Sequence, residues 1–172
     1  MHIRDARPGA DAPACAAIYA PYVRDTVISF ETEVPSAADM AERIVAAQDR
    51  HAWLVAEDEG EILGYAYGSP FKPRPAYAWS CEVSVYLHPD ARGRGLGRTL
   101  YDVLLLRLAE RGMVVALAGI ALPNEASIGL HRAAGFAEAG VFAGVGWKLG
   151  AWRDVAWYRR ALVEPPAAGP VR

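Results

Sequence analysis

The spacing of hydrophobic residues switches between strand and helix periods along the first part of the chain. Residues 2–6 are a short run of strand type, and residues 11–24 carry Ala, Ile and Tyr at helical spacing. Residues 26–32 follow neither period. We therefore expect a strand, a helix and a loop in that order.

A second helix is predicted from residue 36 to about residue 50. Ser36 is a suitable N-cap, and Asp39, three residues on, can complete a capping box. The face that we expect to be buried contains Met40, Ile44 and Val45.

Strand periodicity dominates the next part of the chain. Residues 53–57 and 62–67 are rich in β-forming residues, and the Asp-Glu-Gly-Glu segment between them is typical of a hairpin turn. Prolines break residues 69–76 into a loop, and residues 77–87 read as one long strand. Side chains in a strand point alternately to its two faces. We expect a core face with Trp79, Cys81, Val83, Val85 and Leu87, and a polar face with Ser80, Glu82, Ser84 and Tyr86.

Helices and strands continue to alternate after residue 95. Apolar residues from Leu96 to Leu108 indicate an amphipathic helix that ends at Arg111, with Gly112 as its left-handed cap. The remaining predicted elements are a strand at 114–120, a helix at 124–134 stopped by Gly135, and strands at 136–142 and 153–162.

Length and composition fit one folded unit. A chain of 172 residues is long enough to bury about 70% of the surface that its unfolded form exposes. Its 53% hydrophobic and 22% charged residues are ordinary for a globular protein. We expect residues 1–163 to form a single α/β (α+β) domain, and residues 164–172 to be a flexible C-terminal tail.

The charge balance and the cysteine count exclude several classes of protein. A formal net charge of -2 does not suit a protein whose main ligand is nucleic acid, because phosphate backbones require an excess of Lys and Arg. No apolar run reaches the ~20 residues of a membrane span, and the charged N-terminus is not of signal-peptide type. Cys15 and Cys81 fit neither a disulfide framework nor a metal site. We expect a cytoplasmic protein without a metal ion, a nucleic-acid partner or a membrane partner.

The most specific segment of the sequence is Arg92-Gly93-Arg94-Gly95-Leu96-Gly97-Arg98, between a predicted strand and a predicted helix. Glycine lets backbone N–H groups approach a ligand closely, and the free N–H groups at the start of a helix attract negative charge. The spacing is neither that of a dinucleotide fold nor that of a nucleotide triphosphate loop. A phosphate-bearing ligand is expected here, and a glycine-rich turn with solvated arginines is the alternative.

This segment matches R-x-x-G-x-G, the pyrophosphate loop of the GNAT acetyltransferases. A second stretch, from Asn124 through Ser127 and His131 to Phe136, resembles the N-x-x-[AS]-x-x-L-Y-x-x-x-G-F element of the same family. Residues 53–57, 72–74, 79–86 and 152–155 are similar to the phosphinothricin and methionine sulfoximine acetyltransferase branch. The resemblance implies the GNAT fold, which has a mixed, mostly antiparallel central sheet flanked by helices.

The same resemblance implies an enzyme that transfers an acetyl group from acetyl-CoA to the α-amino group of a small amino-acid-like substrate by direct attack. In such folds the strand that holds Glu82 splays from its neighbour. Backbone groups of this strand would bind the pantetheine arm, and one N–H would stabilise the oxyanion. The implied acetyl-CoA site contains Val85, Tyr86 and Leu87, the seven residues from Arg92 to Arg98, Asn124 and Ser127.

Two residues are candidates for acid–base catalysis. An amine that arrives as ammonium must lose a proton before it attacks, and Glu82 matches the catalytic glutamate of the branch. The alternative for Glu82 is an ordinary exposed carboxylate. His131 stands where many GNAT enzymes have a tyrosine, and it is the candidate acid toward the departing CoA thiolate. The alternatives for His131 are a residue that lines the cofactor and a helix-surface residue that only packs.

The acceptor is expected to meet a basic loop and aromatic walls. Lys72 and Arg74 carry charges that can hold a carboxylate or a phosphinate. A solvated basic loop is the alternative. The other expected acceptor-site residues are Phe30, Pro73, Tyr77, Glu82, Val83, Ser84, Tyr86 and Trp147.

Several alternatives remain open at the level of sequence. The acceptor can be another amine, such as a polyamine, or a protein N-terminus, and the chain can be a non-catalytic module that binds acyl-CoA. The sequence also leaves the physiological acceptor undecided. The branch is usually homodimeric, and an aromatic C-terminal part with Trp147, Trp152 and Trp157 is consistent with subunit contacts.

Overall fold

The computed structural model describes residues 1–164, so the predicted tail lies outside the described residues except for Glu164. Seven strands form one sheet in the order β1-β2-β3-β4-β5-β7-β6. Neighbouring strands are antiparallel except for β4 and β5, which are parallel. The prediction of a mixed, mostly antiparallel sheet is therefore confirmed. The strands are β1 (His2–Asp5), β2 (Trp53–Asp58), β3 (Glu61–Pro70), β4 (Ser80–Leu87), β5 (Val115–Ala121), β6 (Ala137–Lys148) and β7 (Ala151–Ala161).

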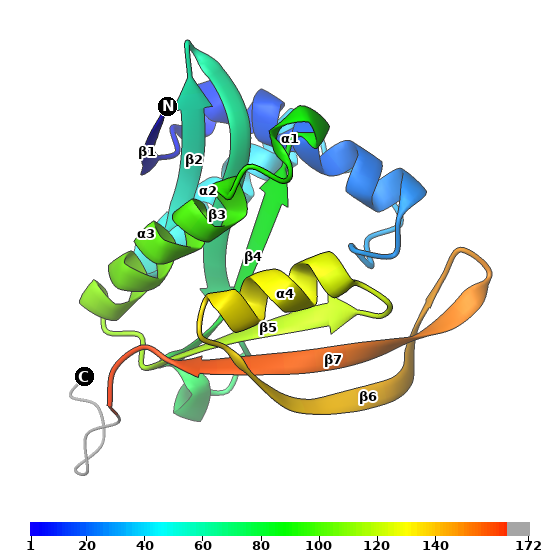
Figure 1. Cartoon of the computed structure of the whole chain (residues 1–172). Helices are drawn as coiled ribbons and strands as arrows, with labels where there is room; N and C mark the ends of the chain where they lie inside the picture. Colours follow the sequence, from blue (N-terminus) through cyan, green and yellow to red (C-terminus); the bar gives the residue numbers. More distant parts are fainter. Residues whose placement is uncertain (165–172) are drawn as a thin grey trace.

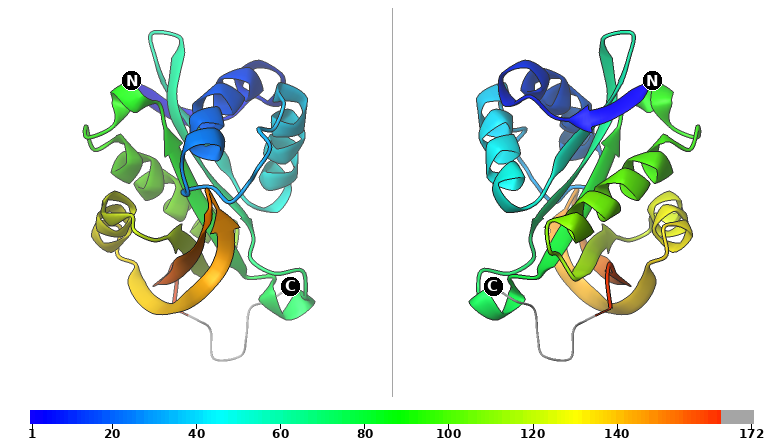
Figure 2. Two further views of the ribbon diagram at one scale, coloured as in Figure 1. Left: turned by 90° about the vertical axis from the view of Figure 1, so that its right-hand side faces the viewer. Right: turned by 90° about the vertical axis from the view of Figure 1, so that its left-hand side faces the viewer.

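Helices cover both faces of the sheet, as Figure 1 and Figure 2 show. One face carries α1 (Pro8–Asp25) and α2 (Ala37–Arg50), and the other carries α3 (Leu96–Glu110) and α4 (Glu125–Ala133). Each face has its own hydrophobic core. Strand β2 is therefore buried on both sides over most of its length, and the predicted α/β class is confirmed.

The boundaries of the first two helices follow from local chemistry. Helix α1 begins three residues before the predicted start, because Pro8 is tolerated in a first turn where its missing N–H costs nothing. Helix α2 has the predicted capping box between Ser36 and Asp39. The prediction that Val45 is buried is wrong: its side chain is 57% exposed. It lies about 100° around the helix from Ile44, outside the buried stripe.

Strand β4 is shorter than predicted, and its predicted polar face is partly buried. It begins at Ser80, because residues Pro75–Tyr77 form a 3₁₀ turn. Cys81 faces the α3 core as expected, and burial raises the pKa of its thiol to about 12. The expectation of a uniformly polar opposite face is wrong at Tyr86, which is 8% exposed. Its ring packs edge-on against Tyr19 of α1, so a helix covers this end of the face.

The last two strands form a hairpin that extends well beyond its predicted length. The two strands meet at a turn formed by Leu149 and Gly150, and the hairpin projects from the body of the molecule (Figure 1). Strand β6 is the edge of the sheet and is exposed along most of its length. Three glycines interrupt the hydrophobic pattern of β6, which explains why its second half was not predicted.

Candidate active site

The sheet opens between the parallel strands β4 and β5. Paired residues run from Ser80 with Val115 to Glu82 with Leu117, and the two strands diverge beyond that point (Figure 1). The opening holds a cavity of about 50 Å³ lined by residues of both strands. Backbone groups that face such an opening have no neighbouring strand to bond, so they are available to a ligand.

Fewer backbone N–H and C=O groups of β4 are free to bind a ligand in this opening than the sequence suggested. The hydroxyl of Tyr22 on α1 donates to the Leu87 carbonyl at 2.8 Å, and the Leu87 N–H donates to the same hydroxyl at 3.2 Å. Alternate residues of a strand direct their backbone groups to the same side, so those of Val85 point the same way as those of Leu87. Val85 lines the opening, whereas Tyr86 directs its N–H and C=O toward β3. Of the three predicted residues, Val85 is the one best placed to bond a ligand through its backbone.

A second cavity, of about 410 Å³, adjoins the first at the start of α3. Gly93 and Gly95 have φ angles of +73° and +78°, a conformation that residues with a Cβ rarely adopt. Gly95 is the N-cap of α3, and no side chain caps the helix there. The first N–H groups of α3 are therefore left for an anion, as predicted from the glycine spacing.

The three arginines of this segment have different surroundings. The guanidinium of Arg92 lies 4.9 Å from the centre of the Tyr22 ring and lines the cavity. Arg98 donates from Nε to Asp102 at 2.8 Å and from Nη1 to the carbonyl of Ala133. The side chain of Arg94 is exposed and does not line the cavity. Arg92 is thus the arginine best placed to meet a bound anion.

Asn124 and Ser127 form the other wall of the same cavity. The Asn124 side chain accepts a hydrogen bond from the Ser127 N–H at 3.1 Å, so Asn124 is the N-cap of α4. Both residues also line the smaller cavity between β4 and β5. The two predicted motifs therefore meet across one continuous groove.

Glu82 lies at the last paired position before the strands diverge, and it is half-buried. Burial raises the pKa of this carboxyl, and the nearby charge of Lys72 partly opposes that shift. Tyr67 of β3 lies on the same face of the sheet, because it pairs with Ser84. A carboxylate with a raised pKa beside an opening in the sheet is suited to accept a proton.

His131 on α4 is buried and makes hydrogen bonds through both ring nitrogens. Nδ1 lies 2.7 Å from the carbonyl oxygen of Ser127, which can only accept, so Nδ1 carries the hydrogen. Burial lowers the pKa of His131, although the bond to Ser127 opposes the shift. The neutral ring therefore accepts at Nε2 from the hydroxyl of Tyr101, 3.0 Å away. His131 lines the smaller cavity but presents no free N–H to it.

The predicted basic loop lies at the N-terminal end of β4. Lys72 is close enough to Glu82 to affect its pKa, and its ammonium lies 5.2 Å from the centre of the Phe71 ring. Pro73, Arg74 and Tyr77 instead line a larger cavity, of about 1160 Å³, together with Lys72. The charge of Lys72 therefore reaches Glu82, although Lys72 lines the same separate cavity as Arg74.

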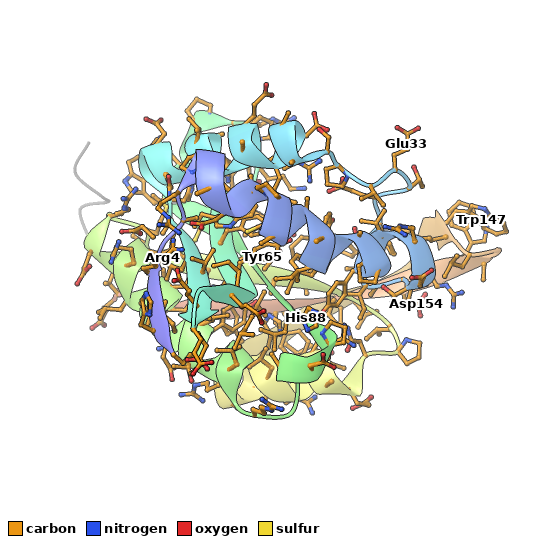
Figure 3. All side chains as sticks on the ribbon, turned by 90° about the horizontal axis from the view of Figure 1, so that it is seen from above. Arg4, Glu33, Tyr65, His88, Trp147 and Asp154 are labelled. Carbon is orange, nitrogen blue, oxygen red and sulfur yellow. The ribbon has the colours of Figure 1, made fainter. Side chains whose placement is uncertain are left out.

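Two predicted aromatic residues lie on other elements. Phe30 belongs to the segment between α1 and α2 and packs against Gly146 of β6. Trp147 lies on the projecting hairpin, far from the centre of the molecule (Figure 3), and its ring packs edge-on against Trp152. Neither residue lines the two adjoining cavities. Within one chain, Phe30 and Trp147 are not walls of the opening.

The structure adds residues that the sequence did not single out. Tyr22 and Ile28 line the larger groove cavity, and Tyr101 lines the smaller one. No local motif marks any of these positions, because each reaches the site through contacts with distant segments.

Comparison with known proteins identifies the family to which this chain belongs. The model of the acetyltransferase (GNAT) family matches residues 16–136. The chain belongs to this family. A phosphinothricin N-acetyltransferase of Alcaligenes faecalis is 44% identical over 156 residues, which cover 88% of this chain and 78% of that protein. An L-methionine sulfoximine/L-methionine sulfone acetyltransferase of Pseudomonas paraeruginosa is 39% identical, and the match covers 98% of both chains.

Solved structures of GNAT enzymes share the whole fold. A GNAT superfamily phosphinothricin acetyltransferase from Sinorhizobium meliloti, in complex with acetyl-CoA, superposes with a TM-score of 0.93 and 38% identity. The match covers 99% of this chain and 93% of that one. This protein is accordingly an acetyl-CoA-dependent N-acetyltransferase. The uncapped N-terminus of α3, the two left-handed glycines and Arg92 fit the diphosphate of acetyl-CoA.

Two further findings bear on metal ions and membranes. Residues 1–164 contain no group of three or more His, Cys, Asp and Glu side chains arranged to hold a metal ion. In the same residues, every helix is too short or too polar to cross a membrane.

Proposed function

We propose that this GNAT enzyme acetylates the α-amino group of a small amino-acid-like acceptor of the phosphinothricin, methionine sulfoximine or methionine sulfone type. The observation that carries the proposal is the position of Glu82, half-buried where β4 and β5 part, with its pKa influenced by the charge of Lys72. The relatives named for these acceptors match nearly the whole chain. A base that feels the charge of a nearby cation suits an acceptor that carries both an amine and an anionic group.

In this proposal the co-substrate lies along the groove between α3 and α4. The N–H groups at the start of α3 and the side chain of Arg92 bind the diphosphate. The backbone of Val85 bonds the arm that enters the opening, and Asn124 and Ser127 line its other side. Acetyl-CoA supplies the acetyl group at the end of this path.

Glu82 is the general base of the proposed reaction. It accepts a proton from the ammonium of the acceptor, which leaves a neutral nitrogen lone pair to attack the acetyl carbonyl. The C–S bond then breaks, and CoA leaves as the thiol with the second proton that the nitrogen loses. Its raised pKa suits this step, because a base works best when its pKa approaches the ambient pH. The hydrogen on Nδ1 of His131 is donated to the Ser127 carbonyl, and Nε2 accepts from Tyr101. We therefore propose that His131 positions α4 and Tyr101 rather than protonating the thiolate.

The experiment that tests this function is a panel of acceptors with acetyl-CoA, followed by release of the CoA thiol. The panel contains amino acids, phosphinothricin, methionine sulfoximine, methionine sulfone, a polyamine and a peptide with a free N-terminus. We expect turnover with the amino-acid analogues and little with the polyamine, since Lys72 repels a cationic chain. Preference for the polyamine or the peptide would overturn the proposed acceptor class. Binding of CoA without turnover of any acceptor would favour the non-catalytic alternative.

We also propose that two copies of this chain assemble through the β6–β7 hairpin. Apolar side chains cover this edge of the sheet, with exposures from 46% at Val141 to 65% at Trp152. An unpaired edge strand with such a surface tends to pair with another chain. The same edge of a second copy can fill this role, because a two-fold symmetric interface joins identical surfaces. The exposed apolar residues of the hairpin are Val141, Phe142, Val145, Trp147, Leu149 and Trp152.

We propose the cytoplasm as the place where this enzyme works. Cys15 and Cys81 are both buried free thiols, which suits a reducing compartment.

A further inference from the structure

Lys148, the last residue of β6, reaches across the molecule to the segment that joins α1 and α2. The residue is 5% exposed, and its ammonium donates to two carbonyl oxygens, those of Val23 at 2.7 Å and Ser29 at 2.5 Å. Burial lowers the pKa of Lys148, and Glu31 opposes this shift only in part because its carboxylate pairs with Arg43. A buried ammonium that bonds carbonyl groups is costly compared with an apolar side chain of the same size.

A second contact fixes the same segment to the same strand. The ring of Phe30 lies directly on the backbone of Gly146, and a Cβ at position 146 would come within 2.2 Å of it. On its other side the segment is bonded to the body of the molecule. The hydroxyls of Ser29 and Tyr19 are 2.6 Å apart, and Tyr19 also donates to Glu31 at 3.0 Å.

The segment held in this way is a wall of the groove. Ile28, between the two carbonyls that Lys148 bonds, lines both the diphosphate cavity and the opening between β4 and β5. Tyr19, which bonds Ser29, packs on Tyr86 of β4 at 4.7 Å between ring centres. A shift of the segment would therefore change the shape of the opening without touching Glu82.

We propose that Lys148 is a positioning residue for the acetyl acceptor: it holds residues 26–36 in place, and with them Ile28, which lines the opening. The inference rests on the proposed function, because it assumes that the acceptor enters there. The opening between β4 and β5 receives the acceptor, and the hairpin that carries Lys148 sets its width. The side chain takes no part in the transfer of protons or of the acetyl group.

The test compares Lys148→Met, which keeps the length and loses the donors, with Lys148→Gln, whose amide can donate to both carbonyls. Arg153→Met is the matched control, since Arg153 lies on the same hairpin and bonds only the Lys148 carbonyl, at 3.4 Å. We expect Lys148→Met to raise the acceptor KM about tenfold. The acetyl-CoA KM should rise clearly less, although Ile28 also lines the diphosphate cavity, because the diphosphate keeps its bonds to the start of α3. Lys148→Gln should restore part of the acceptor KM, and Arg153→Met should behave as wild type.

A second measurement follows the segment without using activity. Glu31 and Glu33 both lie in it, so a glutamate-specific protease can report its mobility. We expect cleavage there to be about tenfold faster in Lys148→Met than in wild type or Arg153→Met. Global stability is compared by urea unfolding, so that faster cleavage is not mistaken for general unfolding.

The outcomes separate this inference from the function on which it rests. An unchanged acceptor KM, an equal rise in both KM values, or an unchanged cleavage rate would overturn the positioning role. If wild type acetylates no acceptor of the proposed class, the proposed function fails and the acceptor role of Lys148 fails with it. The cleavage rates then still decide whether Lys148 holds the segment.

Discussion

Glu82 is half-buried at the last position of β4 that pairs with β5, next to the opening of the sheet. Its neighbours toward the N-terminus are covered by the pairing with β5, and those beyond it face the opening. We expect Glu82→Gln to lower kcat by about 10²- to 10⁴-fold, because the amide cannot accept the proton. The dissociation constant of acetyl-CoA, measured by calorimetry, should stay within about twofold of wild type. Full activity in this variant would remove Glu82 from the mechanism.

The pH dependence of kcat tests how burial and Lys72 shift the pKa of Glu82. A base is active when it is deprotonated, so a raised pKa moves the acidic limb of the kcat profile above the range of an ordinary carboxyl. Lys72 lowers the pKa of Glu82, so Lys72→Met should raise it further and shift that limb to higher pH. Arg74→Met is the control and should leave the limb in place, because the charge that acts on the pKa of Glu82 is that of Lys72 and not that of Arg74. A shift to lower pH in Lys72→Met would contradict this assignment.

Asp11 is the buried carboxylate that ties β1 to α1. Burial alone would raise its pKa, but hydrogen bonds from Arg4 and Arg7 outweigh burial and hold the pKa well below its usual range. The stabilisation is present above the unfolded-state pKa of about 3.9 and is lost as the pH falls below it.

We expect Asp11→Asn to lower the free energy of unfolding at pH 7 by about 2 kcal/mol. In urea titrations the difference from wild type should shrink as the pH falls below about 4, because Asp11 becomes protonated in the unfolded wild-type chain while it stays ionised in the folded one. A difference that stays constant down to pH ~3 would show that the ion pairs with Arg4 and Arg7 contribute nothing.

At the scale of elements, the start of α3 depends on backbone conformation more than on side chains. No atom lies within 4 Å of a Cβ added at Gly95, so a substitution there acts through its φ of +78°. Gly95→Val should raise the acetyl-CoA dissociation constant at least tenfold, since a branched residue in this conformation costs about 1–2 kcal/mol or more. Binding is measured by calorimetry with acetyl-CoA alone.

Gly129→Ala is the matched control for that variant. Gly129 lies within α4, and an added Cβ there also meets no atom within 4 Å, but its backbone is helical. Alanine should stabilise the helix by about 0.5–1 kcal/mol and leave acetyl-CoA binding unchanged. Unchanged binding in Gly95→Val would refute the assignment of the diphosphate to this turn.

At the scale of the whole molecule, the hairpin of β6 and β7 exposes a large apolar surface. If a second copy covers it, Trp152→Glu should convert a dimer to a monomer in sedimentation velocity, because a buried unpaired carboxylate is strongly unfavourable. Leu106→Glu is the control, since Leu106 is as exposed as the hairpin residues but lies on α3. A wild-type chain that sediments as a monomer at high concentration would rule out the proposed assembly.

Contacts inside short segments were predicted correctly. The capping box of α2, the turn between β2 and β3, and the glycine turn before α3 each depend on residues within about six positions of one another. The parity of β4 also placed Glu82 and Cys81 on opposite faces, because alternation is a property of any extended strand. These features give the fold class and the groove for the co-substrate.

Features that depend on distant segments were missed or misjudged. Tyr86 was expected on a polar face, and it is buried because α1 packs over it. Leu87 was expected to bond the co-substrate, but Tyr22, 65 positions earlier, occupies its backbone groups. His131 was a candidate to donate a proton or to line the cofactor; it lines the smaller cavity, and the tertiary fold occupies its ring nitrogens with Tyr101 and Ser127.

The sequence by itself determined the chemistry that is available: a carboxylate on a strand, an anion-binding turn at a helix start, and the elements that carry them. The tertiary structure decided which of these groups remain free to act, how far burial shifts their pKa values, and which segment walls the opening. Lys148 illustrates the division, because its partners Val23 and Ser29 lie 125 and 119 positions away. Local patterns fix backbone conformation, whereas burial and hydrogen-bond partners depend on segments that meet only after folding.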